Sequence, residues 1–100
     1  MNYTVRWLLS AAKDLTEIKK YLDKEIPEMA SDIVGTIYEE GEGLNFMPTR
    51  FPFDDENPKY RRVVVYKTYK IFFRIVGETV QINYVRHTAR NSKGLPINKG

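Results

Sequence analysis

Three strand-forming segments follow one another in the second half of the chain with only short gaps between them. Residues 63–66, 69–76 and 80–86 are rich in the β-branched and aromatic residues that favour strands. Gly77-Glu78 separates the last two segments and suits a two-residue hairpin turn with glycine first, whereas Lys67-Thr68 is a weaker turn sequence. Because such short connections leave no room for a crossover, we expect the three strands to be antiparallel neighbours.

The first half of the chain carries two amphipathic helical patterns after one short strand. Residues 3–7 alternate between apolar and polar side chains, as a half-buried strand does. Apolar residues then recur at three- and four-residue steps in two sets: Ala11, Leu15, Ile18 and Leu22, followed by Met29, Ala30, Ile33, Val34 and Ile37. Ser10 is predicted to cap the first helix, Pro27 to open the second and Gly41 to end it. The short connection around Pro27 predicts an antiparallel αα-hairpin.

The order of these elements predicts an α+β fold. We expect an N-terminal αα-hairpin packed on one face of a small, mostly antiparallel sheet, in the order β-α-α-β-β-β. Residues 1–90 are predicted to form a single domain, and residues 91–100, with two glycines and one proline, a flexible C-terminal tail. Residues 42–60 are predicted to be a loop. Three phenylalanines are expected to anchor this loop to the core: Phe46, Phe51 and Phe53.

The composition argues against several kinds of chemistry. The sequence contains no cysteine and one histidine, so it offers no disulfide, no thiolate nucleophile and no multi-histidine metal site. It has neither a GxxxxGK(S/T) phosphate-binding loop nor an HExxH motif, and we therefore expect no metal or nucleotide cofactor. No segment has the pattern of a signal peptide or a membrane span, so we expect a cytoplasmic protein that does not associate with a membrane.

Positive charge is concentrated in the second half of the chain. Residues 1–50 hold six lysines and arginines against nine acidic residues, whereas residues 51–100 hold ten against four. A basic half on an ordered domain favours an anionic partner such as RNA, DNA or an acidic peptide. The alternative interpretation is that these charges belong to ordinary solvated strand faces.

Strand alternation predicts which of these cations share a face. Lys70 and Arg74 lie on the same side of their strand, with Phe72 between them. Along the last strand, alternation gives two sides: Val80, Ile82 and Tyr84 on one, and Gln81, Asn83 and Val85 on the other. The remaining cationic candidates lie at or just beyond strand ends, where we expect several to converge around one cleft: Arg61, Arg62, Arg86, His87 and Arg90.

Several short motifs occur in an order and spacing typical of one protein family. They are residues 12–15 (AKDL) with Ile18 and Tyr21, 60–65 (YRRVVV), 69–75 (YKIFFRI) and 85–90 (VRHTAR). In this the chain resembles the RelE/ParE toxins of type II toxin–antitoxin systems, also described as plasmid stabilization proteins. The resemblance covers most of residues 3–90. It implies a small antiparallel sheet with an N-terminal helical hairpin, and a co-expressed antitoxin whose acidic or amphipathic C-terminal segment wraps the toxin.

Members of this family differ in their target. RelE-like toxins cut mRNA in the ribosomal A site, whereas ParE-like toxins bind DNA gyrase and block it without cleaving RNA. Lys70 matches the strand position where RNA-cleaving members usually place an arginine, and His87 and Arg90 fall where they place further basic and acid–base groups. The resemblance thus makes Lys70, His87 and Arg90 candidate catalytic residues of an endoribonuclease. Four arginines are then candidates for binding RNA or another target: Arg61, Arg62, Arg74 and Arg86.

The chain departs from the RNA-cleaving pattern in three respects. Lys70 cannot make the bidentate phosphate contact of an arginine. No tyrosine follows Arg90, and the acidic run at residues 54–56 would repel an RNA backbone that lay close to it. Because of the C-terminal histidine and arginines we favour ribosome-dependent mRNA cleavage. Gyrase inhibition is the alternative, and a toxin fold that serves only as a binding partner is the third.

Overall fold

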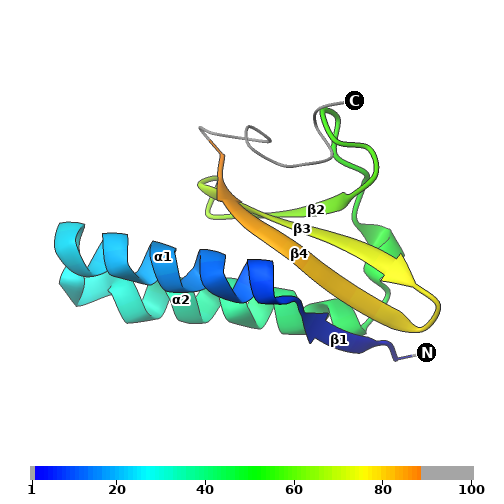
Figure 1. Ribbon diagram of the computed structural model, residues 1–100, viewed down its shortest axis with the longest axis horizontal. Coiled ribbons are helices and arrows are strands. Elements are labelled where there is room, and N and C mark those ends of the chain that lie inside the picture. Colours follow the sequence, from blue (N-terminus) through cyan, green and yellow to red (C-terminus); the bar gives the residue numbers. More distant parts are fainter. Residues whose placement is uncertain (1, 89–100) are drawn as a thin grey trace.

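The computed structural model describes residues 2–88 and has the predicted order of elements (Figure 1). These elements are β1 (Thr4–Trp7), α1 (Leu9–Glu25), α2 (Pro27–Glu42), two 3-10 turns (Gly43–Asn45 and Pro48–Arg50), β2 (Arg61–Val65), β3 (Tyr69–Val76) and β4 (Thr79–His87). The predicted α+β fold is confirmed. The tail predicted for residues 91–100 lies outside the described residues. No helix within residues 2–88 is long and apolar enough to cross a membrane.

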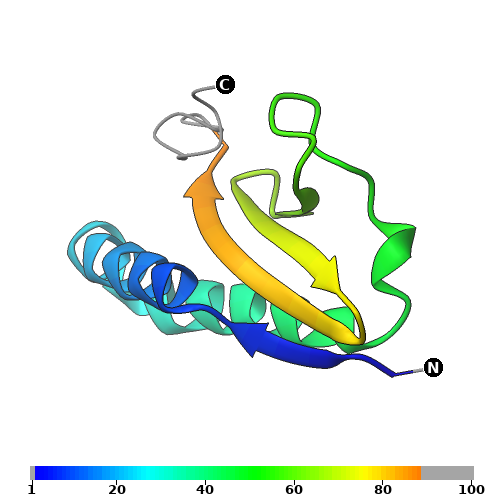
Figure 2. The same cartoon turned by 45° about the vertical axis from the view of Figure 1, so that its right-hand side comes forward.

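The four strands form one sheet in the order β1-β4-β3-β2. Strands β2, β3 and β4 are antiparallel neighbours, as the short connections predicted, and β1 lies parallel to β4 at the sheet edge (Figure 2). In the turn between β3 and β4, Gly77 has a φ of +61°, which glycine adopts without strain. The turn between β2 and β3 uses Tyr66 and Lys67, both at positive φ, and so lies one residue earlier than predicted.

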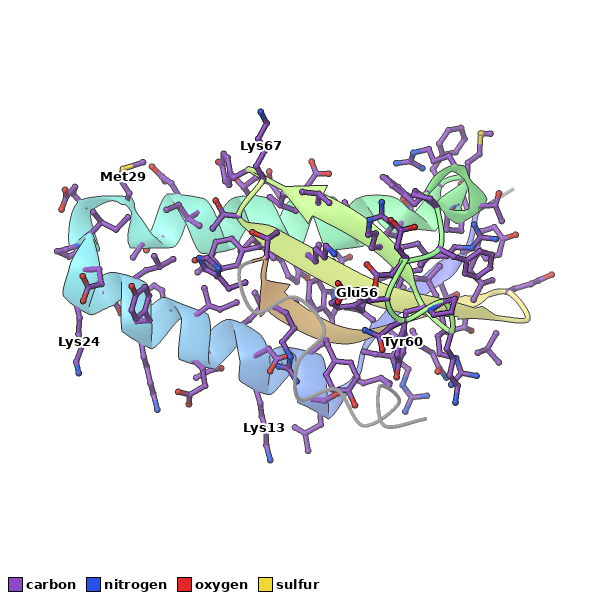
Figure 3. The ribbon with its side chains drawn as sticks, turned by 90° about the horizontal axis from the view of Figure 1, so that it is seen from above. Lys13, Lys24, Met29, Glu56, Tyr60 and Lys67 are labelled. Atoms are coloured by element: carbon purple, nitrogen blue, oxygen red, sulfur yellow. The ribbon has the colours of Figure 1, made fainter. Side chains whose placement is uncertain are left out.

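The helical hairpin packs against one face of the sheet and leaves the other face free of helices (Figure 1). The main core fills the space between them: Ala11, Ile37, Leu44, Val63, Val65, Tyr69, Ile71, Phe73, Val80, Ile82 and Val85. A smaller cluster on the opposite face joins buried Phe72 to Tyr60 and Tyr84. We call this opposite face the outer face. Figure 3 looks onto it and shows Glu56 and Tyr60 lying over the strands.

A β-bulge in β4 changes which side chains share a face. Phe73 of β3 pairs with Ile82 of β4, but Phe72 pairs with Tyr84, so Asn83 is an extra residue in β4. The prediction that Ile82 and Tyr84 lie on one side of the strand is therefore wrong, as is the side shared by Gln81 and Val85. Because a bulge interrupts the two-residue alternation, the residues before Asn83 and those after it are out of phase. Ile82 faces the core, whereas Tyr84 packs on the outer face.

The start of α1 and the end of α2 differ in detail from the prediction. Ser10 lies inside α1 rather than at its cap, and its hydroxyl donates to the carbonyl oxygen of Asn83 at 2.6 Å. Gly41 does not end α2, which continues to Glu42. Gly41 instead lies against Trp7, and a Cβ atom at this position would be 2.7 Å from Cη2 of the indole. A contact this short means that any larger residue at position 41 would force the Trp7 indole to shift.

The loop between α2 and β2 is anchored by one of its three predicted phenylalanines. Phe51 packs against the main core and meets Phe73 edge to face. Phe46 and Phe53 are 54% and 52% exposed, so the expectation that they anchor the loop is wrong. The loop is held by arginine side chains instead, as described below.

Candidate functional site

Four of the predicted site residues have their side chains on the outer face of the sheet. Lys70 pairs with Arg86 across β3 and β4, Arg62 pairs with Phe72, and Arg74 pairs with Gln81. Because paired residues of neighbouring strands point to the same side, the side chains of Arg62, Lys70, Arg74 and Arg86 share this face. Lys70 and Arg74 flank Phe72, as strand alternation predicted.

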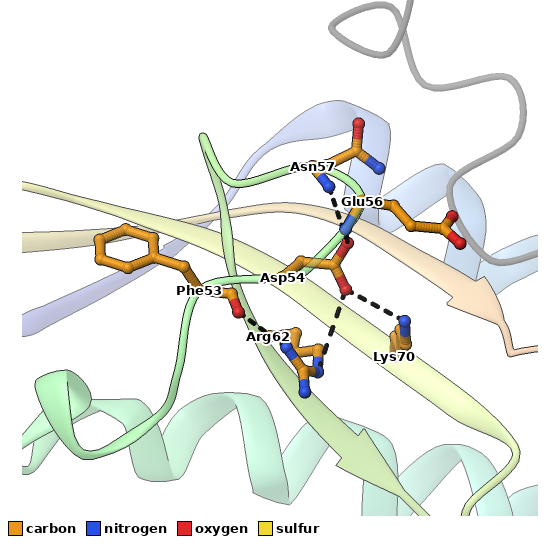
Figure 4. Close-up of polar contacts among 6 residues, drawn as sticks. All are labelled: Phe53, Asp54, Glu56, Asn57, Arg62 and Lys70. Carbon is orange, nitrogen blue, oxygen red and sulfur yellow. Dashed lines mark hydrogen bonds and ion pairs between the residues drawn. The ribbon is translucent and has the colours of Figure 1, made fainter.

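A buried carboxylate, that of Asp54, lies between two of these cations, Arg62 and Lys70 (Figure 4). Asp54, whose side chain is 1% exposed, lies 3.0 Å through Oδ1 from Nζ of Lys70 and 3.9 Å from Nε of Arg62. Its other oxygen, Oδ2, accepts hydrogen bonds from the backbone N–H groups of Glu56 at 3.0 Å and Asn57 at 2.9 Å. The two oxygens thus use two cations and two amides, which is the environment of a bound anion.

This environment also sets the charge state of Asp54. Burial acts to raise the pKa of its carboxyl, but the hydrogen bond from Lys70, the amides of Asn57 and Glu56 and the Lys70 charge together outweigh burial. The pKa of Asp54 therefore lies below its ordinary value of 3.8. Asp54 is ionised at neutral pH and compensates the charge of Lys70.

Two arginines of β2 fasten the preceding loop to the sheet. Arg62 donates through NH1 to the carbonyl oxygen of Phe53 at 2.7 Å. Arg61 donates to the carbonyl oxygens of Phe51 at 2.7 Å and Thr49 at 3.3 Å, and its guanidinium lies 4.1 Å from the centre of the Phe53 ring. Both side chains therefore have a structural role, because they hold the loop against the sheet.

Arg86 is paired with an acidic residue of α1. Asp14 accepts from NH1 of Arg86 at 2.7 Å through Oδ1, and from the backbone N–H of Val85 at 2.9 Å through Oδ2. Strand β1 pairs with β4 only as far as Ile82, so α1 takes over the strand edge beyond that point. Asp14 thus satisfies an edge N–H group that no strand reaches, and neutralises Arg86 as well.

His87 lies apart from Lys70. Its pairing with Tyr69, which belongs to the main core, directs it to the helix side of the sheet, and its ring meets the Tyr69 ring edge to face at 5.5 Å. The exposed imidazole borders a cavity of about 430 Å³ between α1 and the end of β4. This cavity is lined by Asp14, Glu17, Ile18, Tyr21, Tyr69, Val85, Arg86 and His87. Burial, together with the nearby Tyr21, raises the pKa of the Tyr69 hydroxyl.

The structure therefore divides the predicted site residues into groups. Arg62 and Lys70 meet at Asp54, and Arg86 lies beside Lys70 but turns to Asp14. Arg61, Arg74 and His87 do not join them, and Arg90 lies outside the described residues. Within residues 2–88 no three histidine or acidic side chains are placed to hold a metal ion.

The sequence reasoning missed the two carboxylates that organise these cations. From the sequence alone, Asp54 belongs to an acidic run that would repel RNA, although Asp54 followed by Asn57 and Pro58 has the composition of a turn in which an aspartate accepts from backbone amides. Asp14 had the appearance of an ordinary acidic residue near a helix N-terminus. Neither pattern indicates which distant cation the carboxylate meets.

Comparison with solved structures supports the fold and the family. The chain superposes with a TM-score of 0.77 on a chain of the chromosomal ParDE toxin–antitoxin system from P. aeruginosa, at 25% identity and over 85% of this chain and 95% of that one. It also superposes on a chain of the RelBE2 toxin–antitoxin complex from Mycobacterium tuberculosis, with a TM-score of 0.62, 28% identity and coverages of 87% and 92%. A search among curated proteins gave no match.

A family model described as the ParE toxin of the type II toxin–antitoxin system parDE matches residues 5–92. The chain therefore belongs to the ParE toxin family. The resemblance to RelE/ParE toxins inferred from the sequence motifs is confirmed.

Proposed function

We propose that this toxin acts by binding DNA gyrase and blocking it, without cleaving RNA. The observation that carries the proposal is the pairing of the outer-face cations with carboxylates of the same chain. Arg62 and Lys70 share Asp54, and Arg86 is bound to Asp14. The family supports the same conclusion, since the matching family model is that of ParE toxins.

RNA cleavage makes demands that this arrangement meets poorly. Transfer of the 2′-hydroxyl proton needs a base, and the phosphorus transition state needs cations aimed at its oxygens. A phosphate approaching Lys70 would meet the Asp54 carboxylate, which already lies 3.0 Å from the ammonium and repels a second anion. The side chains of Lys70 and of the candidate base His87 also point to opposite faces of the sheet, so one phosphate would not contact both.

One observation favours mRNA cleavage as the second candidate. His87 is exposed beside Arg86 and Tyr69 at the mouth of a cavity, where an imidazole is accessible for proton transfer. In that case His87→Ala abolishes mRNA cleavage on the ribosome while leaving the fold intact. A His87→Ala toxin that arrests growth as the wild type does is the result expected from gyrase binding.

The test of the main proposal is a supercoiling assay with purified gyrase and antitoxin-free toxin. We expect inhibition that saturates near one toxin per binding site on gyrase and that is absent when the toxin is first mixed with its antitoxin. Full supercoiling activity at saturating toxin would overturn the proposal.

We also propose a cognate antitoxin protein as the regulatory partner in the cytoplasm. The two structural relatives are described as a ParDE system and a RelBE2 complex. The antitoxin contacts expected from the sequence are basic residues 59–74 and 86–90. Within residues 2–88, Lys59, Lys67 and Arg74 of this set form no ion pair with a carboxylate of the same chain, so we expect acidic antitoxin side chains to contact these three first. A disordered antitoxin segment would fold as it binds. Copurification should weaken as salt rises, because exposed charge pairs are screened. Binding that is insensitive to salt would contradict the electrostatic part.

A further inference from the structure

We propose that the toxin contacts its protein target through an exposed surface on the loop between α2 and β2. We call this surface the aromatic patch, and it consists of Phe46, Met47, Arg50, Phe53 and Arg61. Its occupant is a folded protein surface that presents carboxylates beside an apolar hollow. The inference rests on the proposed function, in that gyrase is the protein that supplies this surface.

The patch exposes three large apolar side chains in a short stretch of chain. Phe46, Met47 and Phe53 are 54%, 52% and 52% exposed. Arg50 donates through NH1 to the carbonyl oxygens of Phe46 and Met47. Arg61 stacks on Phe53 and donates to the carbonyl oxygen of Thr49, the residue before Arg50, so it connects Phe53 to the other end of the patch. Apolar side chains grouped on the surface of a small domain mark interaction sites, and Phe, Met and Arg are enriched in protein interfaces.

The loop holds these side chains in a fixed arrangement. Met47 has a φ of +45°, a left-handed conformation that is uncommon for methionine and persists only where the surroundings impose it. Here Pro48 is buried directly after it, and Phe46 and Phe53 each form a β-bridge, with Asn2 and Arg61 respectively. Because the loop is ordered before binding, less conformational freedom is lost when a partner docks.

The charge of the patch indicates the chemistry of the partner. Within residues 2–88 neither Arg50 nor Arg61 forms an ion pair, whereas Arg62 and Arg86 of the outer face do. Their positive charge is therefore uncompensated and attracts carboxylates. The NH1 atom of each guanidinium donates to loop carbonyls, and each guanidinium lies over a phenyl ring, so both cations are held beside apolar side chains. Positive charge next to exposed Phe and Met side chains, which bury apolar area against a protein partner, favours an acidic protein surface over a nucleic acid.

Met47→Asp is the variant that tests the patch. Aspartate tolerates the left-handed backbone better than most residues, so the loop should keep its shape. The substitution removes an apolar anchor and places a negative charge where the partner is acidic. Met29→Asp is the matched control, because Met29 is similarly exposed at 49% but lies in the first turn of α2. Phe53→Ala is a second patch variant without a charge change.

The three variants are compared with the wild type in the supercoiling assay, in growth arrest on expression, and in binding to the antitoxin encoded beside the toxin gene. We expect Met47→Asp and Phe53→Ala to need at least about tenfold more toxin for half-inhibition, with antitoxin affinity within about twofold of the wild type. Met29→Asp should behave as the wild type.

The possible outcomes test the aromatic patch and the proposed function separately. Wild-type inhibition of gyrase with equal inhibition by Met47→Asp and Phe53→Ala would overturn the patch alone. Absence of inhibition by the wild type would overturn gyrase as the target, and growth arrest then decides the patch: arrest lost in both patch variants supports it, and arrest retained overturns it. Loss of antitoxin affinity in the patch variants would assign the surface to the antitoxin and overturn the inference.

Discussion

Replacing Asp54 by asparagine exchanges one carboxylate oxygen for an amide nitrogen. This small change should lower the free energy of unfolding strongly. The variant removes the negative charge that compensates Lys70, whose side chain is only 16% exposed. Breaking a fully buried ion pair costs roughly 3–5 kcal/mol, because the remaining charge loses this counter-ion. Since Lys70 retains some access to water and an amide oxygen still accepts one hydrogen bond, we expect a loss of about 2–3 kcal/mol in the free energy of unfolding.

The loss can be measured by urea denaturation, which does not screen charges. Trp7 is the single tryptophan and stacks on Tyr38 at 5.4 Å, so its fluorescence reports unfolding. With a urea dependence of about 1 kcal/mol per molar, the midpoint should fall by about 2–3 M. Asp55→Asn is the matched control, because Asp55 is the exposed neighbour, and its midpoint should stay close to that of the wild type.

The effect of Asp54→Asn should also depend on pH in a defined direction. The folded-state pKa of Asp54 lies below 3.8, so the carboxylate contributes its full stabilisation above that value. The contribution is lost as the pH falls through the folded-state pKa, and the two proteins should then become about equally stable. A difference below about 0.5 kcal/mol at neutral pH, or one that does not shrink in acid, would refute the argument from the buried pair.

Three further substitutions test the helices and their contacts with the sheet. Gly41→Ala should lower the free energy of unfolding by about 1–3 kcal/mol, because the new methyl group collides with Trp7. Gly35→Ala should raise it by about 0.5–1 kcal/mol, since nothing lies within 4 Å of a Cβ there and alanine favours a helix; thermal unfolding followed by circular dichroism distinguishes the two. Asp14→Ala removes the acceptor of the Val85 N–H and should speed hydrogen exchange of that amide by about tenfold or more, whereas unchanged exchange would show that the edge is protected otherwise.

The elements and their order follow from local patterns in the sequence. Apolar side chains at helical spacing, short turns and the break at Pro27 each act over a few residues, and so the αα-hairpin and the three antiparallel strands are predictable. The bulge at Asn83 is not, because no local pattern marks the extra residue, and the Ser10 hydroxyl that donates to the Asn83 carbonyl lies 73 positions earlier in the chain. The two-residue alternation of side chains fails where a strand carries one extra residue.

The candidate site was predictable in its cations but not in their partners. Strand alternation placed Lys70 and Arg74 together because the spacing of two residues is a property of the strand itself. Asp54 lies 16 positions before Lys70 in a loop without periodicity, and Asp14 lies 72 positions before Arg86. Which carboxylate meets which cation is decided by the path of that loop and by helix packing, neither of which a local pattern encodes.

Mapping of mRNA 5′ ends after induction of the toxin without its antitoxin tests the central claim most directly. The account predicts no new cleavage sites within translated codons during growth arrest, because Asp54 and Asp14 compensate the cations that a scissile phosphate would need. New 5′ ends within reading frames, present with the wild type and absent with His87→Ala, would contradict it.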